Sequence, residues 1–206
     1  MKLIGRYLSP FTRRVAVSAK ILGLPFEHLD LSTATQADEI RKYNPMVRVP
    51  TLLLDDGTTL IESGAILDWL DEQAAREKRL VPASGIERRN VLQLVGWATG
   101  AGEKTVAVHY ELNRRPGDKI HRPFVDASLA QVREAFGVLD RAAADGGWLA
   151  GDRLTQADVS AVCFYEFAKV VLPGLFDDAP WSGLAAHCDR AYAAQPAFGE
   201  TDPKPK

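Results

Sequence analysis

The spacing of apolar residues changes after about residue 80. Before that point, short β-type runs alternate with helical stretches in the order strand, helix, strand, helix, strand, strand, helix. From about residue 86 onward, apolar positions recur at helical spacing almost throughout. The first pattern predicts an α/β unit and the second an all-α unit. We therefore expect two domains, 1–80 and 86–200, joined by a segment that contains a charge cluster, a Pro and a Gly.

The first helix of the α/β unit has clear boundary signals. Ser9-Pro10 predicts its start, because Ser caps helices and Pro loses no hydrogen bond at the first helical position. Gly23 predicts its end after Leu22, since Gly is common just past the last turn of a helix. The other expected elements are strands at 2–8, 26–31, 49–54 and 58–61, the last two joined by an Asp-Gly hairpin turn, and helices at 36–43 and after Ser63.

The helical unit carries two folding signals. Thr155 and Asp158 have the form of a capping box at the start of a helix. Apolar residues at steps of four and three predict one buried stripe on an earlier helix, formed by Val125, Leu129, Val132, Phe136 and Leu139.

Composition and charge exclude several functions. The chain has 25 Lys and Arg against 27 Asp and Glu, which is not the positive excess that nucleic-acid binding needs. It lacks the run of about 18 apolar residues of a membrane span, and the apolar core of about 7–15 residues of a signal peptide.

Cys163 and Cys188 have apolar neighbours, so we expect buried free thiols and a cytoplasmic location, with one disulfide as the alternative. The His and Cys residues lack metal-ligand spacing, and no metal is expected. The tail 199–206 lacks apolar anchors and is expected to fray.

Five motifs follow one another along most of the chain. They are Ser9-Pro10-Phe11-Thr12-Arg13-Arg14-Val15, Gly23-Leu24-Pro25-Phe26-Glu27, Asn44-Pro45-Met46-Val47-Arg48-Val49-Pro50-Thr51-Leu52, Glu62-Ser63-Gly64-Ala65-Ile66 and Leu154-Thr155-Gln156-Ala157-Asp158. Together they resemble the glutathione transferase superfamily. The resemblance implies a thioredoxin-like βαβαββα N-terminal domain that binds glutathione, an all-α C-terminal domain, and usually a homodimer.

Ser9 is the candidate catalytic residue. In serine-type members of the family a hydroxyl at this position activates the glutathione thiol, and the resemblance carries that role to Ser9. Physically, a helix N-terminus stabilises an anion, and a hydroxyl that donates to sulfur favours the thiolate. The structural alternative is that Ser9 serves only as a helix cap. Tyr7 is the rival hydroxyl, since other classes use a Tyr near the end of the first strand.

The resemblance also implies a set of glutathione-binding residues. Glu62 would accept from the α-ammonium group, and Ser63 would receive the α-carboxylate at a helix start. Val49, before a cis Pro50, would pair its backbone with the cysteinyl unit. Arg48 would meet the glycine carboxylate, or else be a solvated surface residue.

The remaining candidates are less specific. Phe11 and Arg13 are expected to face glutathione, although Arg13 could equally decorate the first helix. Leu8, Phe11, His109 and Tyr110 are candidates for the pocket of the second substrate, expected between the two domains.

The sequence therefore predicts an enzyme, a glutathione transferase that adds the glutathione thiolate to a small apolar electrophile, with detoxification as the expected role. Two alternatives stay open. One is a glutathione-dependent isomerase, dehalogenase or peroxidase that uses the same site. The other is a non-catalytic binding module with the same fold. Neither nucleic acid nor a membrane is an expected partner.

Overall fold

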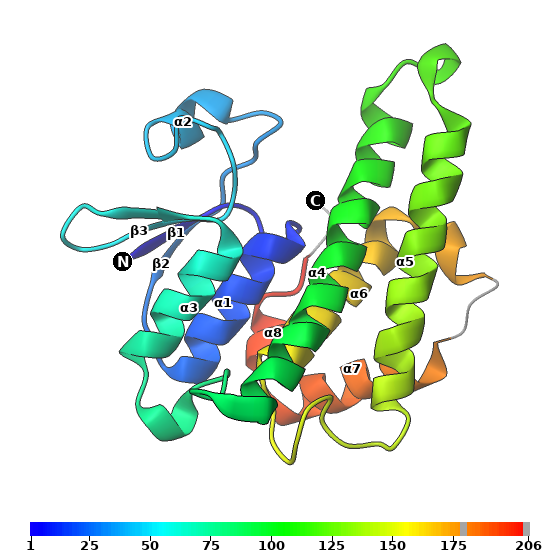
Figure 1. Cartoon of the computed structure of the whole chain (residues 1–206). Coiled ribbons are helices and arrows are strands. Elements are labelled where there is room, and N and C mark those ends of the chain that lie inside the picture. The colour runs from blue at the N-terminus through cyan, green and yellow to red at the C-terminus, as the bar shows by residue number, and fades with distance from the viewer. Residues whose placement is uncertain (178–180, 204–206) are drawn as a thin grey trace. The chain divides into compact units, whose positions relative to one another are not determined.

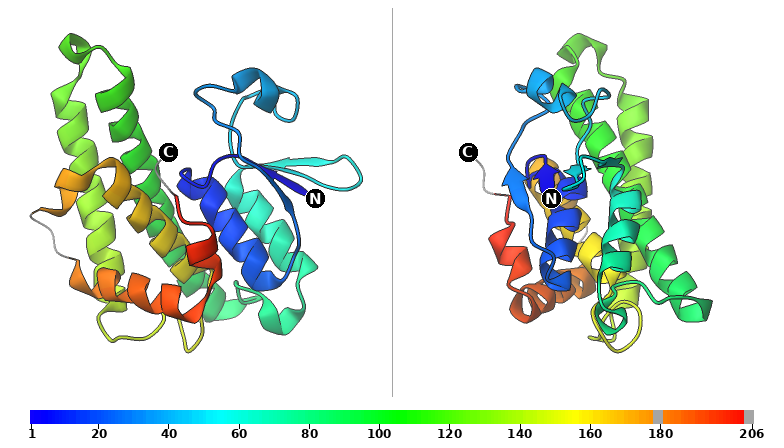
Figure 2. Two further views of the ribbon diagram at one scale, coloured as in Figure 1. Left: turned by 180° about the vertical axis from the view of Figure 1, so that it is seen from behind. Right: turned by 90° about the vertical axis from the view of Figure 1, so that its left-hand side faces the viewer.

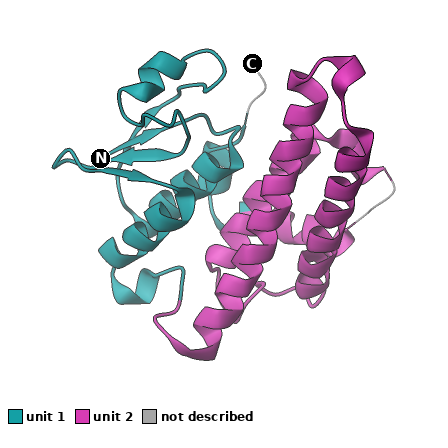
Figure 3. Cartoon of the chain, turned by 45° about the horizontal axis from the view of Figure 1, so that its top comes forward, with its two compact units in different colours: residues 1–81, 192–206 teal, residues 82–191 magenta. Residues whose placement is uncertain are grey.

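The computed structural model describes residues 1–177 and 181–203 (Figure 1). The chain forms two units (Figure 3). The first comprises Met1–Val81 together with the segment that begins at Tyr192, and the second comprises Pro82–Ala191. No helix in the described ranges has both the length and the apolar character needed to cross a membrane.

The first unit is a four-stranded sheet covered by helices. Its elements are β1 (Lys2–Ile4), α1 (Pro10–Leu22), β2 (Glu27–Leu29), α2 (Ala37–Arg41), β3 (Thr51–Leu53), β4 (Thr59–Ile61), α3 (Ser63–Gln73), η1 (Arg76–Lys78) and, near the C-terminus, α8 (Ala197–Glu200). The strand order is β2-β1-β3-β4, with β1 and β2 parallel and the other pairs antiparallel. Helices α1 and α3 lie side by side on one face of the sheet, and α2 lies on the other side (Figures 1 and 2). The predicted βαβαββα order is confirmed.

Helix α1 begins and ends where the sequence predicts. The Ser9 Oγ accepts from the Thr12 N–H at 3.4 Å, and Pro10 occupies the first turn. Gly23 has φ of 74°, and its N–H donates to the Lys20 carbonyl while that of Leu24 donates to Ala19. These bonds satisfy carbonyls that a helix end leaves without partners.

The strands are shorter than predicted. Strand β1 ends at Ile4 because Gly5 has φ of 130°, a conformation that other residues rarely adopt. A Cβ on Gly5 would also lie 2.8 Å from the Val49 Cβ, so Gly here lets the chain pass close to the loop before β3. The predicted hairpin is confirmed: the Leu54 N–H donates to the Thr58 carbonyl at 2.8 Å, and Gly57 has φ of 86°.

The second unit is helical, as predicted. Its elements are α4 (Gly85–Arg114), η2 (Gly117–Lys119), α5 (Arg122–Ala143), α6 (Gln156–Val171), η3 (Pro173–Phe176) and α7 (Ser182–Ala194), the last of which continues into the first unit. Four residues of the predicted α5 stripe are buried, whereas Leu129 is half-exposed and Ser128 is buried instead. The Thr155–Asp158 capping box is present at the start of α6. Cys163 and Cys188 are buried free thiols, and burial raises the pKa of the Cys188 thiol.

The C-terminal segment corrects two predictions. From Tyr192 onward it belongs to the first unit, not to a helical domain that ends at residue 200. Residues 199–203 also do not fray, because polar contacts to α1 replace the missing apolar anchors. The Lys20 ammonium pairs with Glu200 at 2.6 Å, the Arg13 guanidinium pairs with Asp202 at 3.0 Å, and Thr201 is buried. Residues 204–206, which the prediction also included, lie outside the described residues.

Candidate functional site

The N-terminus of α1 presents a hydroxyl beside unneutralised helix N–H groups. Ser9 is half-buried, and its Oγ uses a lone pair to accept from Thr12. Among the described residues, none accepts the Ser9 O–H, so its proton is left for another acceptor. The first turn of α1 contains no acidic residue, which preserves the positive end of the helix dipole. Capping the helix and donating to an anion are therefore compatible roles for Ser9.

Five of the predicted glutathione-binding residues gather around one pocket of the first unit. It has a volume of about 50 Å³ and is lined by Phe11, Arg48, Val49, Pro50 and Glu62 together with Asn44, Met46 and Ile61. We call it the Glu62 pocket. It brings together residues from α1, from the loop before β3 and from the turn before α3, which are far apart in the sequence.

The loop before β3 presents a backbone edge. The Val49–Pro50 bond is cis, as the resemblance implies. In the described part of the chain, the Val49 N–H and carbonyl make no hydrogen bond, so both are available to a peptide-like ligand.

Asn44 holds this loop in place. Its side-chain amide donates to the Arg48 carbonyl and to the Thr51 Oγ1, both at 3.1 Å, and its Oδ1 accepts from the Met46 N–H at 3.0 Å. In the sequence, Asn44 was noted only as the first residue of one of the five motifs, with no role assigned to it. Its position before Pro45 in a motif was the signal that could have revealed this positioning role.

Glu62 and Ser63 form the turn before α3. Glu62 has φ of 72°, and its Oε1 accepts from the Ser63 N–H at 3.0 Å. The Glu62 carboxylate also lies 3.4 Å from the Arg48 guanidinium in an exposed ion pair. A carboxylate that arrived at the Ser63 N–H would have to replace Glu62 there, and a ligand cation at the Glu62 carboxylate would share it with Arg48.

Arg14 is a further candidate site residue, one that the sequence did not single out. Its Nε and Nη2 donate to the Ser63 Oγ at 3.2 and 2.7 Å, and both side chains are buried. A buried cation that holds this hydroxyl favours an anion at the start of α3. Helical geometry could have indicated that the two arginines differ. Consecutive helix residues point about 100° apart, so Arg13 and Arg14 cannot both face the same partner.

Arg13 takes the other direction and does not join the Glu62 pocket. It is buried, and its guanidinium donates to the Tyr192 hydroxyl, the Phe198 carbonyl and the Asp202 carboxylate. The prediction that Arg13 faces glutathione is therefore corrected: its contacts anchor the C-terminal segment.

The candidates for the second-substrate pocket other than Phe11 do not line the Glu62 pocket. Leu8 is half-buried and does not line the Glu62 pocket. His109 and Tyr110 belong to the second unit, where His109 contacts Asn113 and the Tyr110 ring packs 3.7 Å from the Arg114 guanidinium. Burial, and secondarily the charge of Arg114, lowers the pKa of His109. A pocket between the two units remains a prediction.

Within residues 1–177 and 181–203, no group of His, Cys, Asp or Glu is arranged to hold a metal ion.

We expect Arg14→Met to weaken glutathione binding. The substitution keeps a long side chain but removes the buried positive charge behind the Ser63 hydroxyl, and losing its attraction for the α-carboxylate of glutathione, about 1.5 kcal/mol or more, should raise the Kd roughly tenfold or more. Calorimetric titration with glutathione measures the change. Arg13→Met is the matched control. It also removes a buried guanidinium from α1, but the hydrogen bonds described above for that guanidinium go to the C-terminal segment. Equal losses of affinity in the two variants would contradict this role for Arg14.

Comparison with known proteins identifies the family. Residues 3–78 match the model of the glutathione S-transferase N-terminal domain, and residues 122–190 match the model of the C-terminal domain. The chain belongs to the glutathione S-transferase family. It is therefore a transferase enzyme whose co-substrate is glutathione.

Three relatives of this glutathione S-transferase are informative. Maleylacetoacetate isomerase from Pseudomonas aeruginosa is 30% identical over 98% of this chain and 96% of its own. A glutathione S-transferase structure from Methylobacterium radiotolerans, in complex with glutathione sulfonate, is 25% identical, has a TM-score of 0.89 and covers 100% of this chain and 95% of its own. A family member from Pseudomonas fluorescens, with bound S-(propanoic acid)-glutathione, is 28% identical with a TM-score of 0.82, and the match covers 100% of both chains.

Proposed function

We propose that Ser9 donates a hydrogen bond to the sulfur of bound glutathione and keeps it ionised for attack on an apolar electrophile. The observation that carries this proposal is the Ser9 hydroxyl at the start of α1, which caps the helix through its oxygen and retains its proton for a ligand. The attacking atom is the glutathione sulfur, and the chain supplies the environment that makes it nucleophilic.

Magnitudes indicate why the hydroxyl is needed. Lowering a thiol pKa from about 9 to about 6.5 requires ~3–4 kcal/mol, at about 1.36 kcal/mol per pKa unit. A helix N-terminus supplies ~0.3–1 kcal/mol at the surface and up to ~2 kcal/mol when partly buried. The helix alone falls short of the requirement, and a hydrogen bond to a charged acceptor contributes about 1.5–3 kcal/mol more.

The residues around the Glu62 pocket would contact the rest of the tripeptide, which exceeds the pocket's volume of about 50 Å³ and would lie across them. Glu62 would accept from the α-ammonium group, and Ser63, held by Arg14, would receive the α-carboxylate. The Val49 N–H and carbonyl would pair with the cysteinyl backbone, and Arg48 would meet the glycine carboxylate. Phe11 would contribute apolar contact. Support for this assignment comes from the shared pocket and from the backbone edge at Val49.

Ultraviolet titration of bound glutathione tests the proposal directly, because the thiolate absorbs where the thiol does not. We expect the bound sulfur to be mainly ionised at neutral pH, with its pKa at least ~2 units below that of free glutathione, in line with the ~3 kcal/mol above. A bound sulfur that remains protonated at neutral pH would refute the proposed role of Ser9.

A glutathione-dependent isomerase is the second candidate function, favoured by the 30% identity to an isomerase along nearly the whole chain. In such a reaction the thiolate would add to a conjugated double bond, the resulting single bond would rotate, and elimination would release the thiolate again. Glutathione is consumed in conjugation and regenerated in isomerisation. Measuring free thiol during turnover of conjugated cis-alkenes and of aryl halides therefore distinguishes the two.

A cytoplasmic homodimer with a role in detoxification belongs to the same proposal. The family supports the dimer, and the free buried cysteines support a reducing compartment. Sedimentation at micromolar concentration tests the dimer, and a strict monomer would contradict it. The non-catalytic alternative is tested on immobilised glutathione: a folded protein that is not retained would favour it.

A further inference from the structure

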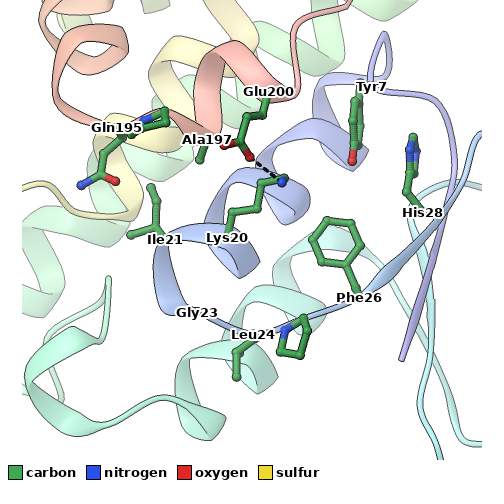
Figure 4. A pocket seen from close by; sticks show the side chains of 12 residues that line it. Tyr7, Lys20, Ile21, Gly23, Leu24, Phe26, His28, Gln195, Ala197 and Glu200 are labelled. Carbon is green, nitrogen blue, oxygen red and sulfur yellow. Dashed lines mark hydrogen bonds and ion pairs between the residues drawn. The ribbon is translucent and has the colours of Figure 1, made fainter.

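The first unit has a second and larger pocket, with a volume of about 640 Å³. It lies beside the C-terminal half of α1, strand β2 and helix α8 (Figure 4). None of its lining residues lines the Glu62 pocket. Its volume falls within the range of about 300–1,000 Å³ that is typical of small-molecule sites. We call it the Lys20 pocket.

One side of the Lys20 pocket is aromatic and flat. The rings of Tyr7 and His28 stack with centroids 3.9 Å apart and planes inclined by 2°. A contact of 2.8 Å between the His28 Nε2 and the Gly5 carbonyl fixes this pair. Figure 4 shows Phe26 on the same side, below the hydroxyl end of Tyr7. Flat, rigid rings of this kind favour a planar aromatic ligand, because offset and edge-on ring contacts add to the burial of apolar surface.

The facing side carries one cation and one anion. The Lys20 Nζ and the Glu200 Oε2 are 2.6 Å apart, and this pair lies opposite the aromatic rings in Figure 4. Each group keeps further hydrogen-bonding capacity, since an ammonium group has three N–H donors and a carboxylate has a second oxygen. The pair therefore offers a ligand both a donor and an acceptor, with no net charge.

The Tyr7 hydroxyl adds to this polar set. In the described ranges it has no hydrogen-bond partner, and it points into the space between the rings and the ion pair. Burial, with smaller contributions from Asp30 and Glu200, raises the pKa of Tyr7, so the phenol keeps its proton at neutral pH. Lys20 and Tyr7 thus offer hydrogen-bond donors to a ligand in this pocket, and Glu200 offers an acceptor.

We propose that the Lys20 pocket binds a planar aromatic molecule whose edge carries an adjacent hydrogen-bond acceptor and donor, the pattern of an aromatic primary amide. The amide carbonyl accepts from the Lys20 ammonium or the Tyr7 hydroxyl, and its NH₂ group donates to the Glu200 carboxylate. The ring lies against Phe26 and Tyr7. A ligand carboxylate would be repelled by Glu200 and a ligand ammonium by Lys20, so the net neutrality of the pair selects a neutral polar edge.

Calorimetric or ligand-detected NMR titration of the full chain with 2-naphthamide tests this proposal. Wild type should bind 2-naphthamide more tightly than 2-naphthoate or 2-naphthylmethylamine, which carry a single charge of either sign. Lys20→Met and Glu200→Gln should each weaken binding about tenfold, the loss expected for one hydrogen bond to a charged group. Lys42→Met is the matched control, since Lys42 pairs with Glu39 on the exposed surface and lines neither pocket.

Saturating glutathione separates this site from the Glu62 pocket. We expect the affinity for 2-naphthamide to stay within about twofold when glutathione is present, because the two sets of lining residues do not overlap. Competition by glutathione would overturn the proposal. So would an undetectable affinity of the folded wild type, equal binding of the amide and the two charged analogues, or unchanged binding in both Lys20→Met and Glu200→Gln. Circular dichroism confirms that each variant is folded, and Lys20 and Glu200 are both exposed enough for substitution to be tolerated.

Discussion

Ser9→Ala is expected to lower turnover with an electrophile such as an aryl halide by at least ~10²-fold, the effect of losing one oriented donor to a developing or stored negative charge. The Kd for glutathione should change little, since the proposed clamp residues are untouched. The loss of turnover is expected because the Ser9 hydroxyl, at the start of α1, has no other acceptor for its proton in the described part of the chain. Steady-state kinetics at saturating glutathione measure the loss.

Ser9→Gly is the control that separates catalysis from helix capping. Replacing a Ser cap by Ala costs about 0.5–2 kcal/mol of stability, whereas Gly costs only a few tenths. If Ser9 acted only as the cap seen at Thr12, both variants would stay folded and retain turnover, and Ser9→Ala would lose only about 0.5–2 kcal/mol of stability. Equal, large losses in both folded variants, with recovery in Ser9→Thr, are the signature of the hydroxyl.

The same kinetics decide between Ser9 and the rival hydroxyl. The Tyr7 ring is stacked on His28 and lines the Lys20 pocket, and burial raises its pKa, whereas Ser9 stands at the start of α1; neither residue lines the Glu62 pocket. These contacts support Ser9 as the donor to sulfur. A large loss of turnover in Tyr7→Phe, with Ser9→Ala active, would transfer the role to Tyr7.

Local signals in the sequence predicted much of the α/β unit. The boundaries of α1 follow from Ser9, Pro10 and Gly23, because caps and left-handed residues act within one turn of the chain. The Asp-Gly turn of the hairpin is equally local. The pocket residues from Phe11 to Glu62 became predictable only through the motifs of the family, since three separate segments supply them.

What the sequence did not reveal depends on partners that are distant along the chain. Arg13 and Arg14 are identical and adjacent, yet one contacts Asp202 and the other Ser63. Only the packing of α1 against α3 and against the C-terminal segment distinguishes them. The C-terminal segment itself was expected to fray because it is polar, but a polar segment is held when buried cations such as Arg13 require its oxygens.

Asp158→Ala is expected to cause the largest loss of stability, about 3–5 kcal/mol, because it leaves several buried groups without their partner. The Asp158 carboxylate is fully buried. It accepts from the Leu149 N–H at 2.8 Å, from the Thr155 N–H at 2.7 Å and from the Thr155 hydroxyl at 2.9 Å, and it lies 3.1 Å from the His187 Nε2. One side chain thus joins the start of α6, the loop before it and α7.

Urea unfolding of wild type, Asp158→Ala and Asp158→Asn measures this effect. Asp158→Asn keeps one acceptor oxygen and the size of the side chain, so it should lose less stability than Asp158→Ala. Thr155→Ala removes only the hydroxyl half of the capping box and should cost about 0.5–2 kcal/mol. A loss in Asp158→Ala no greater than that in Thr155→Ala would mean that the contacts to Leu149 and His187 contribute nothing measurable. The greater loss would show that this one carboxylate stabilises the second unit by linking segments that the capping motif alone does not reach.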